Sequence, residues 1–288
     1  MGWKLHVLKT SILGRVPFGD QLRRIKRQTF GYLPDPDNLR GTLQNLDDMR
    51  NAVHAAGRSF ADATVLEIGS GWFPTIPIML SAQGARKVFL TDLNPHMDRT
   101  TFAATLDFLR PYLVDHPRAA GKSSLEDFGL EYIAPFRPDA IPNGTIDFII
   151  SRTVLEHIPA EDLQGILAEL RPKLATGGLM LHCVDHSDHL EHRDKSISKI
   201  NFLTWSERRH KLVNWLTKEG ENRLRHHEYR KVFERAGYEI AFESGQPHPA
   251  TLESARTLPL QHRFAQMTPA EVSILSSIYL LSPRPGAR

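Results

Sequence analysis

The segment Val65–Gly71 reads VLEIGSG and is the most informative stretch of the chain. An apolar, β-branched run from Thr64 to Ile68 is typical of a buried strand, and it ends directly in Gly69. A helix is expected from Pro74 onward. A strand that leads through a glycine loop into a helix lets the backbone approach a ligand closely at the carboxyl end of a sheet. The segment therefore predicts a strand–loop–helix unit that binds a ligand.

Short apolar runs alternate with helical segments through the middle of the chain. The expected strands are Thr64–Ile68, Lys87–Asp92, Leu130–Ala134, Ile146–Ser151 and Leu179–Val184. Strands that alternate with helices of about ten to fifteen residues form βαβ units. The pattern therefore predicts an α/β fold with a parallel sheet.

Two kinds of nucleotide ligand are compatible with the glycine loop. A dinucleotide-binding loop requires G-x-G-x-x-G, but Pro74 stands at the third glycine position. Asp92 closes the second expected strand about twenty residues beyond Gly71, a spacing at which a carboxylate reaches a pair of ribose hydroxyls. The alternative is that Asp92 caps the following turn. Taken together, the loop and Asp92 predict a ligand that contains a nucleoside.

The acid two residues before the first glycine gives the loop the form E-x-G-x-G, from Glu67 to Gly71. Here the chain resembles the class I S-adenosylmethionine-dependent methyltransferases. In that family the acid orients the loop and the methionine ammonium, and the glycines let the cofactor lie against the backbone. Trp72-Phe73-Pro74 departs from the family, which often has a third glycine at position 73. A catalytically silent binding domain and, less favoured, a nicotinamide-dependent oxidoreductase are the alternatives.

The resemblance continues through the remaining strands in the same order. Ile146–Ser151 followed by Val154-Leu155-Glu156-His157 is similar to a segment of the small-molecule branch of this family. The stretches Arg235–Tyr238 and Ile274–Ser282 are similar to its last helix-to-strand turn and its final antiparallel strand. The resemblance implies a Rossmann-like class I methyltransferase sheet, mostly parallel with the last strand antiparallel, and S-adenosyl-L-methionine as cofactor.

The cofactor-binding residues that this resemblance implies come from the ends of four strands. They are Glu67, Gly69, Ser70, Gly71, Trp72, Asp92, Leu93, Pro135, Ser151 and Arg152. The third strand lacks the acid that many members place near the adenine amino group. We therefore expect Pro135 or Phe136 to pack against the adenine.

Candidate catalytic groups lie after the fourth expected strand and on or after the fifth. Methyl transfer to a hydroxyl requires a base that removes its proton. Because the carboxyl ends of parallel strands meet at one edge of a sheet, Glu156 and His182 are expected to converge there, with His186 as a further candidate. The alternative for His182 is a hydrogen-bonded histidine with a structural role. Histidines at positions 182, 186, 189 and 192 have a spacing compatible with metal binding, but a polar loop is favoured and no metal is predicted.

The expected methyl acceptor is a small polar molecule or a sugar-containing intermediate, methylated on oxygen or nitrogen. Ser151-Arg152-Thr153-Val154 replaces the Asn/Asp-Pro-Pro-aromatic loop of enzymes that methylate exocyclic base nitrogens. The formal net charge of +3 over 288 residues is also small for a nucleic-acid-binding protein. A nucleic acid is therefore not expected as partner.

The chain is expected to divide into an N-terminal helical cap over residues 1–60 and a methyltransferase domain over residues 61–288. A lid-like insertion is expected over residues 185–226, where the aromatic residues form either an acceptor-binding wall or a small core of their own. No integral membrane segment and no secretory pattern are recognised. The single cysteine, Cys183, is compatible with a reducing compartment, so a cytoplasmic location is expected.

Overall fold

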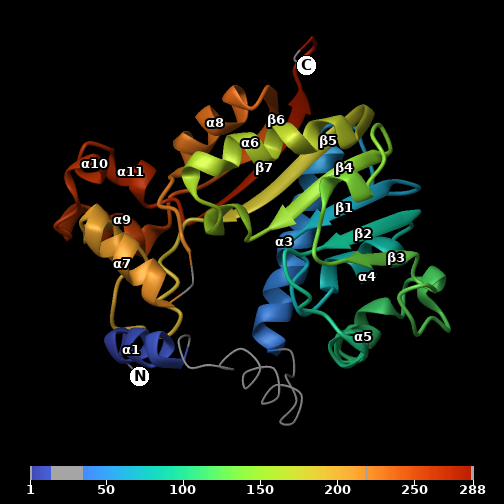
Figure 1. Ribbon diagram of the computed structural model, residues 1–288, viewed down its shortest axis with the longest axis horizontal. Coiled ribbons are helices and arrows are strands. Elements are labelled where there is room, and N and C mark those ends of the chain that lie inside the picture. The colour runs from blue at the N-terminus through green and yellow to red at the C-terminus, as the bar shows by residue number, and fades with distance from the viewer. Residues whose placement is uncertain (1, 14–34, 218–219, 287–288) are drawn as a thin grey trace.

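The computed structural model describes residues 2–13, 35–217 and 220–286. Its centre is a seven-stranded sheet in the order β3-β2-β1-β4-β5-β7-β6 (Figure 1). The strands are β1 (Thr64–Ile68), β2 (Lys87–Thr91), β3 (Leu130–Ile133), β4 (Ile146–Arg152), β5 (Leu174–Asp185), β6 (Tyr238–Ser244) and β7 (Ser276–Pro283). The pairs from β3 to β5 are parallel, and β7 runs antiparallel to both β5 and β6, which confirms the predicted Rossmann-like methyltransferase sheet.

Helices cover both faces of this sheet (Figure 1). One face carries α3 (Pro36–Ala55), α4 (Thr75–Ala82) and α5 (Arg99–Leu113), and the other carries α6 (Ala160–Leu170) and α8 (His226–Arg235). Successive strand residues point to opposite faces, so Val65 belongs to the first core and Leu66 to the second. Both faces are buried, which explains why the central strands are continuously apolar and do not alternate.

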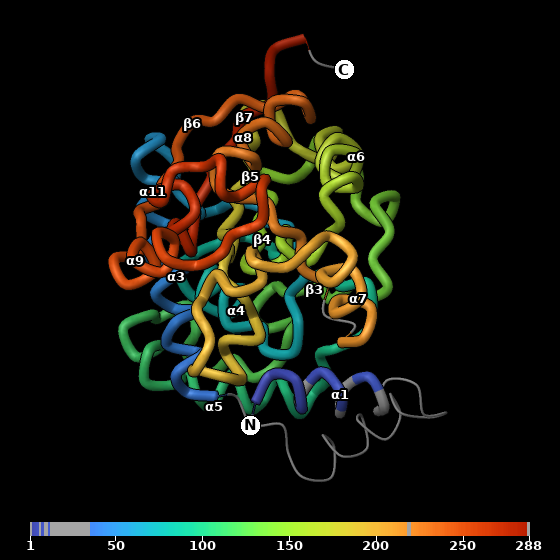
Figure 2. The backbone as a smooth tube through the Cα atoms, turned by 90° about the vertical axis from the view of Figure 1, so that its left-hand side faces the viewer, coloured from blue at the N-terminus to red at the C-terminus, as the bar shows by residue number. Residues whose placement is uncertain are grey.

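A third, smaller core lies beyond the end of the sheet at which β4 and β5 finish (Figures 1 and 2). It is built by α1 (Trp3–Leu13), α7 (Glu207–Thr217), α9 (Pro249–Thr257), α10 (His262–Ala265), α11 (Pro269–Val272) and the turn Asn201–Thr204. Trp3 stacks on Trp205 with ring centroids 5.2 Å apart. The segment between β6 and β7 thus joins the segment after β5 in one subdomain, a pairing the sequence pattern did not reveal.

The two described helices of the predicted N-terminal cap pack in different places. The helix α1 contacts α7 in the small core, whereas α3 contacts α4 and the strands β5, β6 and β7. Met49 and Val53 of α3 are fully buried in the first main core. The division of the chain at residue 60 stays a prediction. No helix among the described residues is both long and apolar enough to cross a bilayer.

Candidate active site

The loop between β1 and α4 depends on two glycines in left-handed backbone conformations. Gly69 has a φ of 71° and Gly71 a φ of 68°, which L side chains rarely adopt. A Cβ on Gly69 would lie 2.6 Å from Cγ2 of Val154, whereas a Cβ on Gly71 would meet nothing within 4 Å. Gly69 is therefore needed for packing against the segment that follows β4, and Gly71 leaves its side of the loop open to a ligand.

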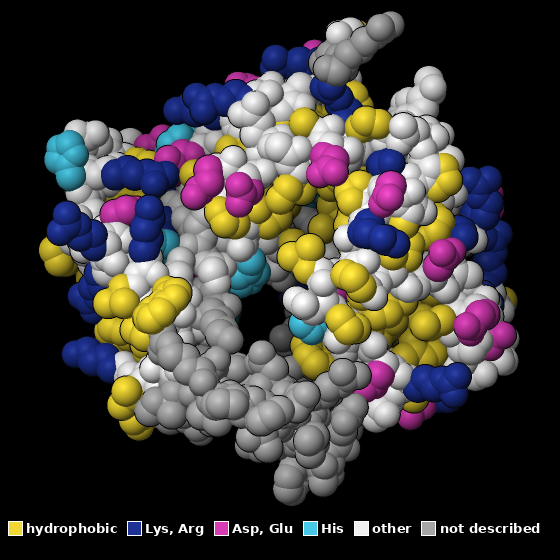
Figure 3. Space-filling model, in the orientation of Figure 1, with side chains coloured by type: hydrophobic (Ala, Val, Ile, Leu, Met, Phe, Trp, Pro, Cys, Tyr) yellow, Lys and Arg dark blue, Asp and Glu magenta, His cyan; other side chains and the backbone are white. Residues whose placement is uncertain are grey.

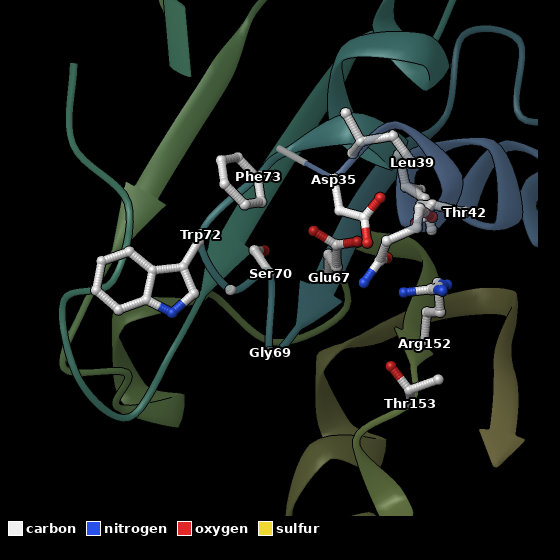
Figure 4. Close-up of a pocket in the computed structure, with 13 residues that line it drawn as sticks. Asp35, Leu39, Thr42, Glu67, Gly69, Ser70, Trp72, Phe73, Arg152 and Thr153 are labelled. Carbon is white, nitrogen blue, oxygen red and sulfur yellow. Dashed lines mark hydrogen bonds between the residues drawn. The ribbon is translucent and has the colours of Figure 1, made fainter. Parts of the chain in front are cut away.

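A cavity of about 420 Å³ opens beside this loop (Figure 4). This volume lies within the range of about 300–1,000 Å³ that small-molecule sites occupy. The lining residues are Asp35, Asn38, Leu39, Thr42, Glu67, Gly69, Ser70, Gly71, Trp72, Phe73, Ile76, Arg152 and Thr153. The cavity thus lies between the glycine loop, the start of α3 and the end of β4.

Glu67 is the most unusual group in this cavity. Its side chain is buried, with 5% of the residue exposed, and its Oε2 forms no hydrogen bond with the described residues. Burial raises the pKa of Glu67 to about 7, and the nearby charge of Asp92 acts in the same direction. Figure 4 shows the carboxylates of Asp35 and Glu67 and the guanidinium of Arg152 directed toward the same space. A buried carboxylate oxygen without a partner is costly, so the site is suited to a ligand that brings a cation or a donor.

Asp92, at the end of β2, fixes the glycine loop. Its Oδ1 and Oδ2 lie 3.2 and 3.1 Å from the Gly71 backbone nitrogen, which donates to them. The Tyr132 hydroxyl donates to Oδ2 at 3.1 Å, and burial raises the pKa of Asp92. These contacts connect the predicted ribose-binding acid with the predicted cofactor loop.

Of the remaining predicted cofactor residues, some line the cavity and others lie outside it. Arg152 lines the cavity and donates through Nε to Asn45 Oδ1 at 2.8 Å. Trp72 also lines it, but its ring points away from Glu67 (Figure 4) and lies 5.1 Å from the His96 ring. Leu93 and Pro135 have exposed side chains beyond the ends of β2 and β3.

The position of Ser151 differs from the expectation. Its side chain is fully buried, and its hydroxyl is 2.8 Å from Nδ1 of His182. It does not line the cavity, because the alternation along β4 turns Ser151 to the opposite face from Arg152. Its side chain therefore lies in the interior beside His182 and does not point into the cofactor cavity.

The start of α3 is the part of the site that the sequence analysis missed. Asp35, Asn38, Leu39 and Thr42 line the cavity, and the Asp35 side chain caps the helix by accepting from the Asp37 nitrogen at 3.0 Å. An aspartate followed by proline is a recognisable helix start. That local signal predicts the residue at which the helix begins. It does not predict that the first turn of the helix packs beside the glycine loop.

Comparison with known proteins agrees with this geometry. The sequence pattern of the methyltransferase domain matches residues 27–241, about three quarters of the chain. The chain belongs to the methyltransferase domain family. This match confirms the prediction of a methyltransferase enzyme that uses S-adenosylmethionine. No curated protein sequence matches the chain significantly.

Solved structures of methyltransferases resemble this one over most of its length. Magnesium protoporphyrin IX methyltransferase from Synechocystis PCC 6803 is 16% identical, with a TM-score of 0.49 over 96% of this chain and 99% of its own. A methyltransferase from Mesorhizobium loti is 15% identical, with a TM-score of 0.46 over 83% and 95%. Geranyl diphosphate C-methyltransferase from Streptomyces coelicolor A3(2) is 12% identical, with a TM-score of 0.48 over 84% and 79%.

The predicted catalytic histidines of the methyltransferase lie in its interior. His182 is fully buried on β5, stacks on Phe233 at 5.9 Å, and has its pKa lowered to about 3 by burial. His186 is also buried, with Nδ1 3.1 Å from the Leu224 carbonyl and Nε2 2.8 Å from the Ser277 hydroxyl. The carbonyl can only accept, so Nδ1 of His186 donates and Nε2 accepts. Both nitrogens of His186 are thus engaged within the protein, which favours a positioning role over the predicted catalytic one.

Glu156 lies apart from His182 in the hydrogen-bond network. Its Oε1 accepts from the Asp185 nitrogen at 3.3 Å, and its buried Oε2 forms no hydrogen bond with the described residues. Burial raises the pKa of Glu156 to about 8. The hydrogen bond of His182 goes to Ser151 instead. No hydrogen bond therefore joins Glu156 to His182 in the described structure.

Glu156 instead belongs to a group of five residues that we call the histidine–carboxylate cluster: Glu156, His157, Asp185, His189 and Glu221. His189 lies at its centre, with Nε2 3.5 Å from Asp185 Oδ2 and Nδ1 3.1 Å from Glu221 Oε1. Burial opposes the charged form of His189, but these two carboxylates raise its pKa to about 9. The sequence placed His189 in a histidine-rich stretch but gave no indication of its partner Glu221.

A second cavity of about 310 Å³ borders this cluster. It is lined by His157, Pro159, Ala160, Glu161, Glu207, His210, Lys211, Asn214, Gly220, Glu221, Asn222, Arg223, Leu224 and Arg263. Figure 3 shows the molecule hollowed between the sheet and the small subdomain, with histidine side chains at the rim of the hollow. Charged groups of both signs line this second cavity, so it suits a polar ligand better than an apolar one.

Proposed function

We propose that the chain transfers the methyl group of S-adenosylmethionine to an oxygen or nitrogen of a small polar molecule or a sugar-containing intermediate. The observation that carries the proposal is the buried carboxylate of Glu67 at the edge of a 420 Å³ cavity beside the glycine loop, because its Oε2 has no hydrogen-bond partner in the described part of the chain. The ammonium group of the cofactor's methionine part would supply the missing partner, so the residues present fit this cofactor.

The other cofactor contacts follow from the strand ends. The carboxylate of Asp92 already accepts from Gly71 and Tyr132, and each of its oxygens has two lone pairs, which leaves capacity for ribose hydroxyls. The exposed side chains of Leu93 and Pro135 would cover the adenine. Bound there, the cofactor supplies an electrophilic methyl group on a sulfonium. The protein's contribution is to hold the acceptor in line with it.

The histidine–carboxylate cluster and the second cavity support a polar acceptor on the other side of the segment that follows β4. Thr153 lines the cofactor cavity and His157 lines the second one, so Glu156 lies in the short stretch between them. We assign Glu156 to the acceptor side, and His182 and His186 to positioning the strands that carry it. The formal charge of +3 supports a small acceptor over a nucleic acid, and the single cysteine supports a cytoplasmic location.

Transfer of labelled methyl from S-adenosylmethionine tests the acceptor class directly. The purified chain would be screened against hydroxyl- and amine-bearing metabolites, against sugars and sugar-linked intermediates, and against DNA and RNA in parallel. Label in a small polar molecule or sugar is the expected result. Label in nucleic acid, with none in any small molecule, would contradict the proposed acceptor class.

Affinity for S-adenosylhomocysteine should depend on pH through Glu67. With a pKa of about 7, roughly one Glu67 in ten is ionised at pH 6 and nine in ten at pH 8. The ligand's ammonium selects the ionised carboxylate, so we expect affinity to be about tenfold lower at pH 6 than at pH 8. Calorimetric titration at the two pH values measures this. If the affinity of Glu67→Gln also differed tenfold between pH 6 and pH 8, another group would be responsible for the pH dependence.

Replacing Asp92 with alanine should weaken cofactor binding more than it weakens the fold. The substitution removes the carboxylate that holds the Gly71 nitrogen and that we assign to the ribose. Hydrogen bonds to a charged acceptor contribute about 1.5–3 kcal/mol, so the Kd for S-adenosylhomocysteine should rise by about 10- to 100-fold. Asp98→Ala is the matched control, because Asp98 caps α5. An unchanged Kd in folded Asp92→Ala would refute the ribose assignment.

A further inference from the structure

The histidine–carboxylate cluster has the composition and spacing of a metal site. Glu156, His157 and His189 each offer a ligand atom, and the three atoms all lie within 4.8 Å of one another. Glu156 and His157 follow β4, and His189 lies in the segment after β5. Two neighbouring parallel strands therefore bring the three side chains together at the end of the sheet where ligands bind in such folds.

The hydrogen bonds around the two imidazoles match those of metal-binding histidines. Nδ1 of His157 is 2.8 Å from the Gly220 carbonyl, and Nδ1 of His189 is 3.1 Å from Glu221 Oε1. A histidine that ligates a metal through one nitrogen generally donates its other N–H to a carbonyl or carboxylate, which fixes the ring. Rings held in this way would bind a metal through Nε2.

A buried carboxylate oxygen supplies an independent indication. Oε2 of Glu156 is buried and forms no hydrogen bond with the described residues, while Oε1 accepts from the Asp185 nitrogen. The Asp185 carboxylate lies 3.5 Å from Nε2 of His189, so it is placed to provide a fourth ligand. A cation among these groups would satisfy the unpartnered oxygen of Glu156.

We propose that Glu156, His157 and His189, with Asp185, bind one divalent transition-metal ion. Ligand atoms of a tetrahedral ion bound at about 2.1 Å lie about 3.4 Å from one another. The three atoms, which lie within 4.8 Å of one another, would therefore have to approach by at most about 1.4 Å, which side-chain rotations can supply. Two imidazoles with carboxylates suit zinc, manganese, iron or cobalt better than magnesium or calcium, which prefer oxygen ligands alone. The second cavity, lined by His157 and Glu221, gives the ion a path from solvent.

The role of the ion rests on the proposed function. An ion at this position would face the cavity that we assign to the acceptor, where it could bind an acceptor oxygen and favour release of its proton to water in the second cavity. The ion would then make the acceptor oxygen a better nucleophile, and Glu156 would act as a ligand rather than as a free base. The residues of the cofactor cavity do not include Glu156, His157 or His189, so metal and cofactor binding can be measured separately.

Cobalt(II) is the probe that tests the site, because its coordination by nitrogen and oxygen ligands is visible in the absorption spectrum. The full chain, treated with a chelator and dialysed, would be titrated with cobalt(II) alone. We expect saturation at one ion per chain, and a loss of affinity of at least about tenfold in His157→Gln and in His189→Gln. His192→Gln is the matched control, since His192 stacks on His189 at 5.3 Å but lies outside the cluster. It should bind cobalt like the unmodified chain.

Titration of every variant with S-adenosylhomocysteine separates this proposal from the proposed function. Unchanged affinity for that ligand shows that the variants are folded and that the cofactor site is intact. Absence of saturable cobalt absorption in the unmodified chain, or equal cobalt affinity in His157→Gln, His189→Gln and His192→Gln, would overturn the proposal. The cluster would then be an ion-pair network centred on His189. Because His157 is exposed, its variant keeps the test valid if His189→Gln fails to fold.

Discussion

Replacing Glu67 with glutamine should lower the affinity for S-adenosylhomocysteine by about 10- to 100-fold at pH 8. The substitution keeps the size of the side chain but removes the charge that we assign to the ligand's ammonium. A charge-assisted hydrogen bond contributes about 1.5–3 kcal/mol, which corresponds to this range. Calorimetric titration measures the change. Glu131→Gln serves as control, since Glu131 lies on β3 with a half-exposed side chain and pairs with Lys87.

The same substitution should leave the fold as stable as before, or make it more stable. Because burial raises the pKa of Glu67 from 4.5 to about 7, ionisation of this group costs the fold about 3 kcal/mol above pH 7. The free energy of unfolding is therefore highest at low pH, where Glu67 is protonated, and it declines as the pH rises from about 4.5 to 7. A higher or equal melting temperature combined with weaker binding would identify Glu67 as a functional group held at a cost in stability. Unchanged affinity would argue against its role at the ammonium.

Replacing Arg225 with methionine should destabilise the fold by about 3–5 kcal/mol, because each buried carbonyl left without a donor costs about 1–3 kcal/mol. Arg225 is completely buried and donates to three backbone carbonyls: His186 at 2.6 Å, Val272 at 2.7 Å and Ile274 at 2.6 Å. It thereby joins the segment after β5 to the α11–β7 connection. Methionine would leave these buried carbonyls without donors.

Thermal unfolding measures this effect, and we expect the melting temperature of Arg225→Met to fall by on the order of 10 °C. Arg263→Met is the matched control. Arg263 is 47% exposed in its side chain and pairs with Glu228, and surface pairs of this kind contribute about 0–1 kcal/mol. Equal melting temperatures for Arg225→Met and Arg263→Met would show that the hydrogen bonds of Arg225 do not hold the small subdomain to the sheet.

The central fold was predictable because its signals are local. The strand at Thr64–Ile68, the glycine loop and Asp92 each depend on residues close in sequence, and the structure brings Asp92 to within hydrogen-bond distance of Gly71. The positive φ of Gly69 and Gly71 explains why glycine is required there. Patterns of this kind predict the elements and their order along the chain.

The rest of the site depends on contacts between distant segments. The start of α3 lines the cofactor cavity although Asp35 precedes the glycine loop by more than thirty residues. Ser151 was expected at the cofactor, but its side chain lies on the opposite face of β4 from Arg152, with its hydroxyl 2.8 Å from Nδ1 of His182 on the neighbouring strand. His189 and Glu221 meet only because the segments on either side of α7 fold back on each other. Periodicity and motif spacing carry no information about such pairings.

Calorimetric titration with S-adenosylhomocysteine, run in parallel with NADH, tests the central claim most directly. We expect S-adenosylhomocysteine to bind with one site per chain and NADH to show no binding. Binding of NADH, or no binding of S-adenosylhomocysteine to the folded chain, would contradict the assignment of the Glu67 cavity to the methyl-donor cofactor.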